Sequence, residues 1–92
     1  MSGAEIARRV VVSGNVQGVF FRDRTRREAR TRGVAGWVRN CADGTVEAHF
    51  EGPADAVESL VRWAHAGPRH ASVDDVRVDD VEPQGFDGFR VR

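Results

Sequence analysis

Apolar and polar residues alternate over residues 6–13, where a run of β-branched side chains favours a first strand. Residues 21–32 predict a helix, chiefly from their arginine and glutamate content and from Gly33, since glycine commonly follows the last helical residue. The apolar face of this helix is thin, so its periodicity alone is a weak signal. Residues 34–40 predict a second strand with small and apolar side chains on one face.

The middle of the chain continues with a hairpin and a second helix. The loop over residues 41–44 contains an Asp-Gly turn dipeptide, so a third strand over residues 45–51 should pair antiparallel to the second. Gly52-Pro53 opens the second helix, with proline expected at its first position. Apolar residues then follow the helical spacing i, i+3, i+4, i+7, at Val57, Leu60, Val61 and Ala64.

Valines at intervals over residues 73–81 predict a fourth strand, although Asp74-Asp75 interrupts its alternation. A turn over residues 82–85 precedes a short last strand, expected at Phe86 and residues 89–91. The resulting order, βαββαβ plus a short fifth strand, is typical of the α+β ferredoxin-like sandwich. Its antiparallel sheet carries two helices on one face. We expect residues 1–92 to form one domain.

Composition limits the classes of function. Cys41 is the one cysteine, which excludes an internal disulfide and suits a reducing compartment. The first residues lack the apolar segment of a secretory signal, and no apolar run approaches the ~20 residues of a spanning helix. We therefore expect a soluble, cytoplasmic protein that does not associate with membranes, and a monomer at this size.

The zero net charge conceals an asymmetry between the two halves of the chain. Residues 1–40 hold nine arginines and three acidic residues, a net +6, and residues 41–92 hold five arginines and eleven acidic residues, a net −6. The basic half contains a glycine-bracketed loop, Gly14 to Gly18, ahead of the predicted helix, with Arg22 at the helix entry. Free N–H groups at a helix start, flexible glycines and a guanidinium can together hold a phosphate.

Other chemistries lack their residues. The chain has no lysine, which excludes a P-loop and a Schiff-base nucleophile, and its histidines and cysteine lack zinc-site spacing. The three histidines are expected at surface or strand positions. Asn40 ends the second predicted strand, and the residues alone leave two roles open for it: a turn former, or a polar group of the site.

Two segments carry a resemblance to a known family. Residues 14–22, Gly-Asn-Val-Gln-Gly-Val-Phe-Phe-Arg, resemble the signature of acylphosphatases, and residues 36–40, Gly-Trp-Val-Arg-Asn, resemble their second signature. The resemblance extends over nearly the whole chain. It implies hydrolysis of acyl phosphates to a carboxylate and inorganic phosphate, with no metal, no cofactor and no phosphoenzyme.

The resemblance also implies roles for individual residues. Arg22 matches the arginine that binds the substrate phosphate, and Asn40 matches the asparagine that holds the attacking water. The loop whose N–H groups surround the phosphoryl oxygens matches Val16, Gln17, Gly18, Val19 and Phe20.

Several side chains carry further expectations. Phe20 and Phe21 are expected to pack in the core or loop, and Gln17 either supports the loop or is exposed. Asp23 is expected to stabilise the helix start through its dipole rather than to pair with Arg22. Arg32 stands where family members usually carry an apolar residue, which predicts a less firmly docked first helix.

Two alternatives to an enzyme are considered. A βαββαβ sheet can bind RNA, but such proteins display aromatic residues on central strands, whereas residues 45–51 offer one phenylalanine and residues 6–13 none. We therefore expect no nucleic-acid partner. A phosphate-binding regulatory domain of the same fold, without turnover, is the second alternative.

Overall fold

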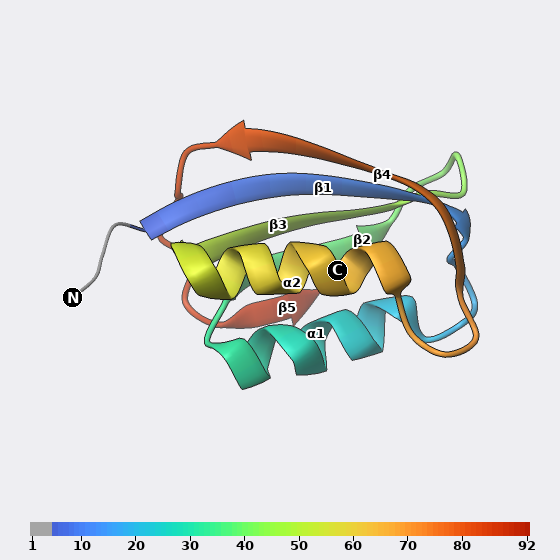
Figure 1. Cartoon of the computed structure of the whole chain (residues 1–92), viewed down its shortest axis with the longest axis horizontal. Helices are drawn as coiled ribbons and strands as arrows, with labels where there is room; N and C mark the ends of the chain where they lie inside the picture. Colours follow the sequence, from blue (N-terminus) through green and yellow to red (C-terminus); the bar gives the residue numbers. More distant parts are fainter. Residues whose placement is uncertain (1–4) are drawn as a thin grey trace.

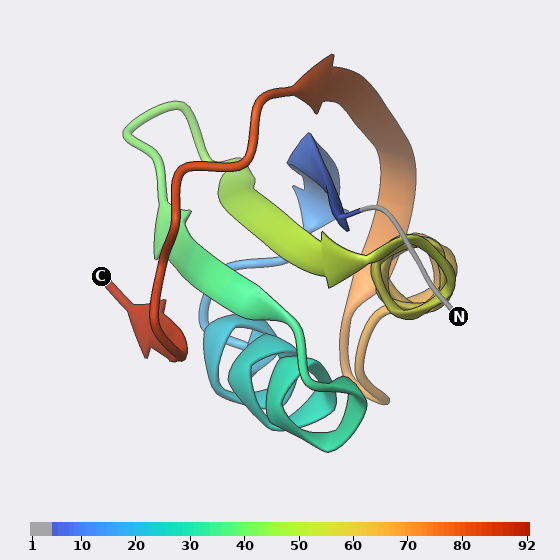
Figure 2. The same ribbon diagram turned by 90° about the vertical axis from the view of Figure 1, so that its left-hand side faces the viewer.

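The computed structural model describes residues 5–92. A five-stranded sheet of order β4-β1-β3-β2-β5 carries both helices on one face (Figures 1 and 2). Residues 1–4 lie outside this range, and they are part of the N-terminal segment in which no secretory signal is expected. The elements are β1 (Glu5–Asn15), α1 (Phe21–Arg32), β2 (Ala35–Asn40), β3 (Val46–Pro53), α2 (Ala54–Ala66), β4 (Ser72–Val81) and β5 (Phe89–Val91).

The predicted ferredoxin-like fold is confirmed, and the four long strands are antiparallel as expected. β1 lies between β3 and β4, and β2 pairs with β3 so that Asn40 stands opposite Val46 at one end of the sheet. The fifth strand pairs parallel to β2, which makes the sheet mixed. Phe86 lies outside this last strand, contrary to the prediction.

The interrupted alternation of the fourth strand has a structural cause. Ser13 pairs with Asp75 and Gly14 pairs with Val73, so Asp74 is an extra residue in a β-bulge. Gly14 has φ 124°, and a Cβ on it would overlap the carbonyl oxygen of Ser72. Only glycine fits this crossing, where β1 turns toward the loop that precedes α1.

The helix α1 has the predicted bounds and the predicted thin apolar face. Phe21, Thr25 and Ala29 are its buried residues, and the Thr25 hydroxyl donates to the Phe21 carbonyl at 2.7 Å. Gly33, at φ 71°, ends the helix in a left-handed conformation. Arg32 donates to the Ser59 hydroxyl of α2 at 2.9 Å, so the polar residue at this position ties the two helices together.

The second helix begins one residue later than predicted. Pro53 is the last residue of β3, with φ −57° and ψ 141°, and it precedes rather than starts α2. Val57, Leu60 and Ala64 are buried as their spacing predicts, and Val61 is partly buried. They pack over the inner face of the sheet, among Val10, Val12, Val38 and Phe50.

The opposite, outer face of the sheet carries polar residues that are nevertheless buried. Glu47, His49 and Glu51 of β3 are all at most 5% exposed. The connection from β4 to β5, residues 82–88, crosses this face from one edge of the sheet to the other (Figure 2).

The three histidines lie where they are expected. His49 is a strand residue, while His65 and His70 lie at the surface. No helix among residues 5–92 is long and apolar enough to cross a membrane.

Candidate active site

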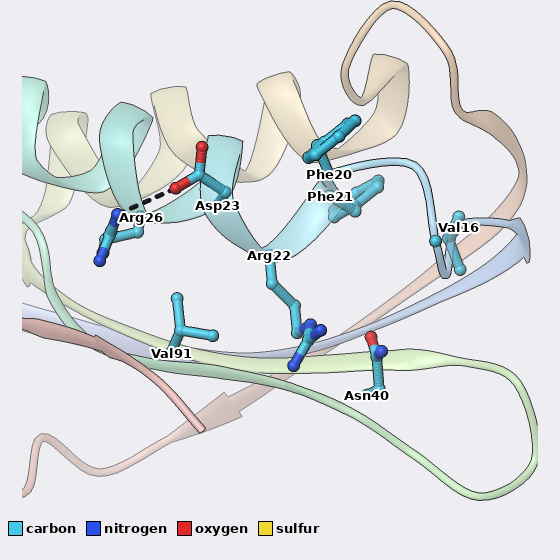
Figure 3. Close-up of a pocket in the computed structure, with 9 residues that line it drawn as sticks. Val16, Phe20, Phe21, Arg22, Asp23, Arg26, Asn40 and Val91 are labelled. Atoms are coloured by element: carbon cyan, nitrogen blue, oxygen red, sulfur yellow. Dashed lines mark hydrogen bonds and ion pairs between the residues drawn. The ribbon is translucent and has the colours of Figure 1, made fainter.

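A pocket of about 390 Å³ lies where the loop after β1, the start of α1, the end of β2 and β5 meet (Figure 3). Two of its lining residues come from segments far apart in the sequence, Arg22 on α1 and Asn40 on β2. The full lining is Val16, Gly18, Phe20, Phe21, Arg22, Asp23, Arg26, Asn40 and Val91.

The loop over residues 16–20 presents backbone to this pocket. Val16 is buried and anchors the loop, whereas Gly18 and Phe20 take positive φ values of 75° and 65°. Within residues 5–92, the N–H groups of this loop find no backbone acceptor. Free N–H groups in a chain with left-handed residues form a concavity suited to an anion.

Phe20 is the one non-glycine residue with positive φ among the described residues, and the residue is 73% exposed. The expectation that it packs in the core or loop is therefore wrong. Phe21 packs as expected: it is 3% exposed, and the centroids of its ring and the Trp63 ring are 5.7 Å apart. A bulky residue rarely adopts a left-handed conformation, which costs about 1–2 kcal/mol. This local strain coincides with the loop that faces the pocket.

Gln17 supports the loop, which resolves its two possible roles. Its amide nitrogen donates to the carbonyl oxygens of Cys41 at 2.8 Å and Thr45 at 2.9 Å. Both acceptors belong to the turn between β2 and β3, where Thr45 also donates to the Asp43 carboxylate. The Thr45 hydrogen bonds hold the pKa of Asp43 below its usual range. The amide of Gln17 thus fixes the loop relative to the end of β2.

Arg22 is the second residue of α1, and its guanidinium reaches across the pocket toward the end of β2 (Figure 3). Its Nη1 donates to the Arg92 backbone oxygen at 3.4 Å. Asp23 contacts Arg26 at 2.9 Å and Arg27 at 3.3 Å, and makes no ion pair with Arg22. As expected, the aspartate lies in the first turn of the helix, and the adjacent guanidinium keeps donors for an anion.

Asn40 is the last residue of β2, and its side chain points into the same space as the Arg22 guanidinium (Figure 3). Its Oδ1 is a buried side-chain oxygen without a hydrogen-bond partner among the described residues. Buried polar atoms are normally paired, so an unpaired acceptor facing a pocket marks a place for a donor from solvent or ligand. The position therefore offers more than a turn-forming role.

The structure brings together most of the residues singled out from the sequence. Val16, Gly18, Phe20, Arg22 and Asn40 all line the pocket. Gln17 acts from behind the loop. Val19 packs against the core cluster.

Sequence reasoning missed Arg26 and Val91, and it left open whether Arg92 reaches the pocket, where its backbone oxygen accepts from Arg22. Nothing local in the sequence indicates that β5 reaches this pocket. No group of three or more His, Cys, Asp or Glu side chains arranged to hold a metal occurs in residues 5–92.

Comparison with known proteins gives consistent matches. Residues 8–91 match the model of the acylphosphatase family. A curated acylphosphatase of Haloquadratum walsbyi is 58% identical over 92 residues, 100% of this chain and 99% of that protein. One of Rubrobacter xylanophilus is 62% identical over 86 residues, 91% of this chain and 77% of that protein.

Solved structures agree. An acylphosphatase from Coxiella burnetii superposes with a TM-score of 0.92 at 39% identity, covering 96% of this chain and 93% of that one. The acylphosphatase of Bacillus subtilis gives 0.91 at 38% identity, covering 95% and 98%.

Proposed function

The chain belongs to the acylphosphatase family and is an enzyme that hydrolyses acyl phosphates, and from this premise we propose how its own residues perform the reaction. Phosphate is held by the N–H groups of residues 16–20 and by the Arg22 guanidinium, and Asn40 positions the attacking water. One observation carries this proposal: the unpaired Oδ1 of Asn40 faces the guanidinium across one pocket.

The leaving group explains why so few side chains are needed. A carboxylate departs from an acyl phosphate, and its conjugate acid has a pKa of about 4, so it leaves without a proton. No general acid is required near it. The pocket lining accordingly contains no histidine, cysteine or lysine.

The phosphoryl group is where charge develops. In the transition state, charge spreads over three phosphoryl oxygens, which fixed N–H donors and a guanidinium stabilise. Removal of one such donor typically costs about 3–4 kcal/mol of barrier. The strained loop and the Gln17 tether support this role because they hold the donors in place before substrate arrives.

Asn40 acts by position. A neutral amide is not a base, but its Oδ1 can accept a hydrogen bond from water and hold that water in line with the leaving carboxylate. The lining holds one carboxylate, Asp23, whose oxygens are paired with Arg26 and Arg27. These pairings support direct attack by water without a phosphoenzyme, and one carboxylate is a poor donor set for a divalent metal ion.

We further propose that residues 1–92 act as one domain and as a cytoplasmic monomer without a nucleic-acid partner. The outer face of the sheet, which RNA-binding proteins of this topology use, is crossed by residues 82–88. Trp37 there lies against His49, with ring centroids 6.3 Å apart. Weak retention on heparin at physiological salt is the expected result for such a surface.

The test is hydrolysis of benzoyl phosphate in the presence of EDTA, together with binding of inorganic phosphate. Wild-type turnover should survive EDTA. Arg22→Ala should lose both phosphate binding and hydrolysis, and Asn40→Ala should lose hydrolysis while phosphate still binds. Full kcat in Asn40→Ala would refute the water-positioning role, and phosphate binding without any wild-type turnover would point to a regulatory domain.

A further inference from the structure

Glu51 is a buried carboxylate on the outer face of the sheet, away from the pocket. It is 3% exposed and belongs to β3, the strand between β1 and β2. Its carboxylate accepts three consecutive backbone N–H groups, from Gln84 at 2.8 Å, Gly85 at 2.8 Å and Phe86 at 2.9 Å. His49 Nε2 contacts the same carboxylate at 2.7 Å.

These three N–H groups belong to residues 82–88, the crossing segment, which has no regular secondary structure. Consecutive N–H groups that converge on one point form a nest for an anion, and here the anion is a side chain of the protein itself. Gly85, at φ 81°, permits the turn that aims them. The Phe86 ring adds an edge contact with His49, with centroids 5.2 Å apart. Glu51 therefore fastens the middle of the crossing segment to the sheet.

The crossing segment leads directly into a wall of the pocket. The Gly88 carbonyl accepts the Gly36 N–H at 2.9 Å, and the Arg92 N–H donates to the Val38 carbonyl at 2.8 Å. Between these bonds lies β5, which is only three residues long. Val91 of β5 lines the pocket, and the Arg92 backbone oxygen accepts from the Arg22 guanidinium.

We infer that Glu51 is a positioning residue for phosphate binding, acting through the crossing segment and β5 on Arg22. The inference rests on the proposed role of Arg22 in holding phosphate. A strand of three residues has few hydrogen bonds of its own, so its place beside β2 depends on how the preceding segment is held. The Glu51 carboxylate supplies that hold through both of its oxygens.

Glu51→Gln tests this with little change of shape. The amide keeps one acceptor oxygen but places an NH₂ group where the other oxygen accepted, so at least one of the three backbone N–H groups loses its acceptor. Glu47→Gln is the matched control. Glu47 is a buried carboxylate on the same face of β3, but its partners are the Arg9 and Arg39 side chains rather than the crossing segment.

The readouts are the inhibition constant of inorganic phosphate and the separate values of kcat and KM for benzoyl phosphate, measured on protein shown to be folded by circular dichroism. Glu51→Gln should raise the phosphate inhibition constant and KM together by about 3- to 10-fold, in the range for residues coupled to a site through a contact network. Because Asn40 is untouched, kcat should change less. Glu47→Gln should leave both binding values within about 2-fold of wild type.

Equal weakening of phosphate binding by the two variants would overturn the inference, since it would mark general loosening of the sheet. So would wild-type binding by folded Glu51→Gln. If this variant does not fold, Glu51→Asp, whose shorter side chain reaches fewer of the N–H groups, is held to the same expectations. Arg22→Ala separates the two proposals: intact phosphate binding in that variant would refute the role of Arg22 itself. Lost binding there with wild-type binding in the Glu51 variants would refute only the role of Glu51.

Discussion

Phe20 and Phe21 are neighbours of the same type with opposite environments. Phe21 starts α1 and fills the core beside Trp63, while Phe20 is exposed and left-handed at the junction between loop and helix. The residue pattern alone does not separate them, because either could serve as the first apolar contact of a thin helix face. The left-handed conformation of Phe20 at the entry into α1 decides which ring is buried.

This difference predicts opposite responses to substitution. Phe20→Gly should change the free energy of unfolding by no more than about 1 kcal/mol, because relief of a left-handed residue offsets the added flexibility of the unfolded chain. Phe21→Ala should cost about 3–5 kcal/mol through the cavity it leaves. Urea unfolding followed by fluorescence measures both, and similar losses in the two variants would contradict the assigned environments.

Gln17 predicts a separation between stability and activity. Gln17→Met keeps the length of the side chain but removes two hydrogen bonds to the β2–β3 turn, at a cost of about 1–3 kcal/mol in the free energy of unfolding. The freed loop should bind inorganic phosphate more weakly at temperatures where the variant remains folded. Thr31→Val, which removes a helix-surface hydrogen bond far from the loop, serves as the control. Unchanged phosphate affinity in Gln17→Met would show that the loop holds its shape unaided.

At the scale of elements, most of the fold follows from local signals. Gly33 ends α1 where expected, and the Asp-Gly turn correctly joins antiparallel strands. The parallel pairing of β5 could not be predicted, because three residues carry no periodicity and their place depends on the crossing segment. The candidate site residues Arg22 and Asn40 could be predicted from the motif resemblance. The Arg92 backbone oxygen could not, because a contact made by the backbone does not depend on the type of side chain.

The β-bulge at Gly14 gives a prediction for the edge of the sheet. Gly14→Ala should destabilise the protein by more than Gly33→Ala, although both glycines have positive φ. A Cβ at position 14 overlaps the Ser72 carbonyl, while one at position 33 meets open space. Backbone strain costs each variant about 1–3 kcal/mol, and overlap adds to the first. Equal urea midpoints would show that β4 shifts freely to accommodate the methyl group.

At the scale of the whole molecule, we expect the two buried carboxylates of the outer face to contribute to stability against acid. Burial alone would raise the pKa of Glu51, but hydrogen bonds from Gln84, His49, Phe86 and Gly85 outweigh it and hold the pKa below its usual range. Burial would likewise raise the pKa of Glu47, but hydrogen bonds from Arg39 and Arg9 outweigh it, so this pKa is also lowered. Both groups bind protons less readily in the folded state than in the unfolded state.

The sign of the pH dependence follows from this difference. The stabilisation is fully present above the unfolded pKa of about 4.3 and is lost as pH falls through the lower folded pKa values. Urea midpoints should therefore drop steeply below about pH 4.5, and Glu51→Gln or Glu47→Gln should flatten that decline. Parallel curves for wild type and both variants would assign acid unfolding to other groups.

Phosphate binding should also stabilise the whole molecule. A ligand that binds only the folded state at 100 times its Kd adds about 2.7 kcal/mol to the free energy of unfolding. The melting temperature should rise with phosphate concentration in wild type and in Asn40→Ala, and stay constant in Arg22→Ala. Sulfate at matched ionic strength tests whether charge alone suffices, and a rise in Arg22→Ala would contradict the assigned anion site.

The bulged strand β4 has a consequence for how copies of this protein meet. It forms an outer edge of the sheet, and a free edge is a template for pairing with another chain. Here the extra residue at Asp74 breaks the straight row of hydrogen-bonding groups, and the aspartates of β4 outnumber its one arginine, Arg77, so the strand carries net negative charge. Two such edges would repel each other, so the acidic residues of β4 oppose strand-to-strand aggregation. Replacement of Asp75, Asp79 and Asp80 by asparagine should make the protein aggregate. Light scattering should then rise at protein concentrations where the natural sequence stays clear.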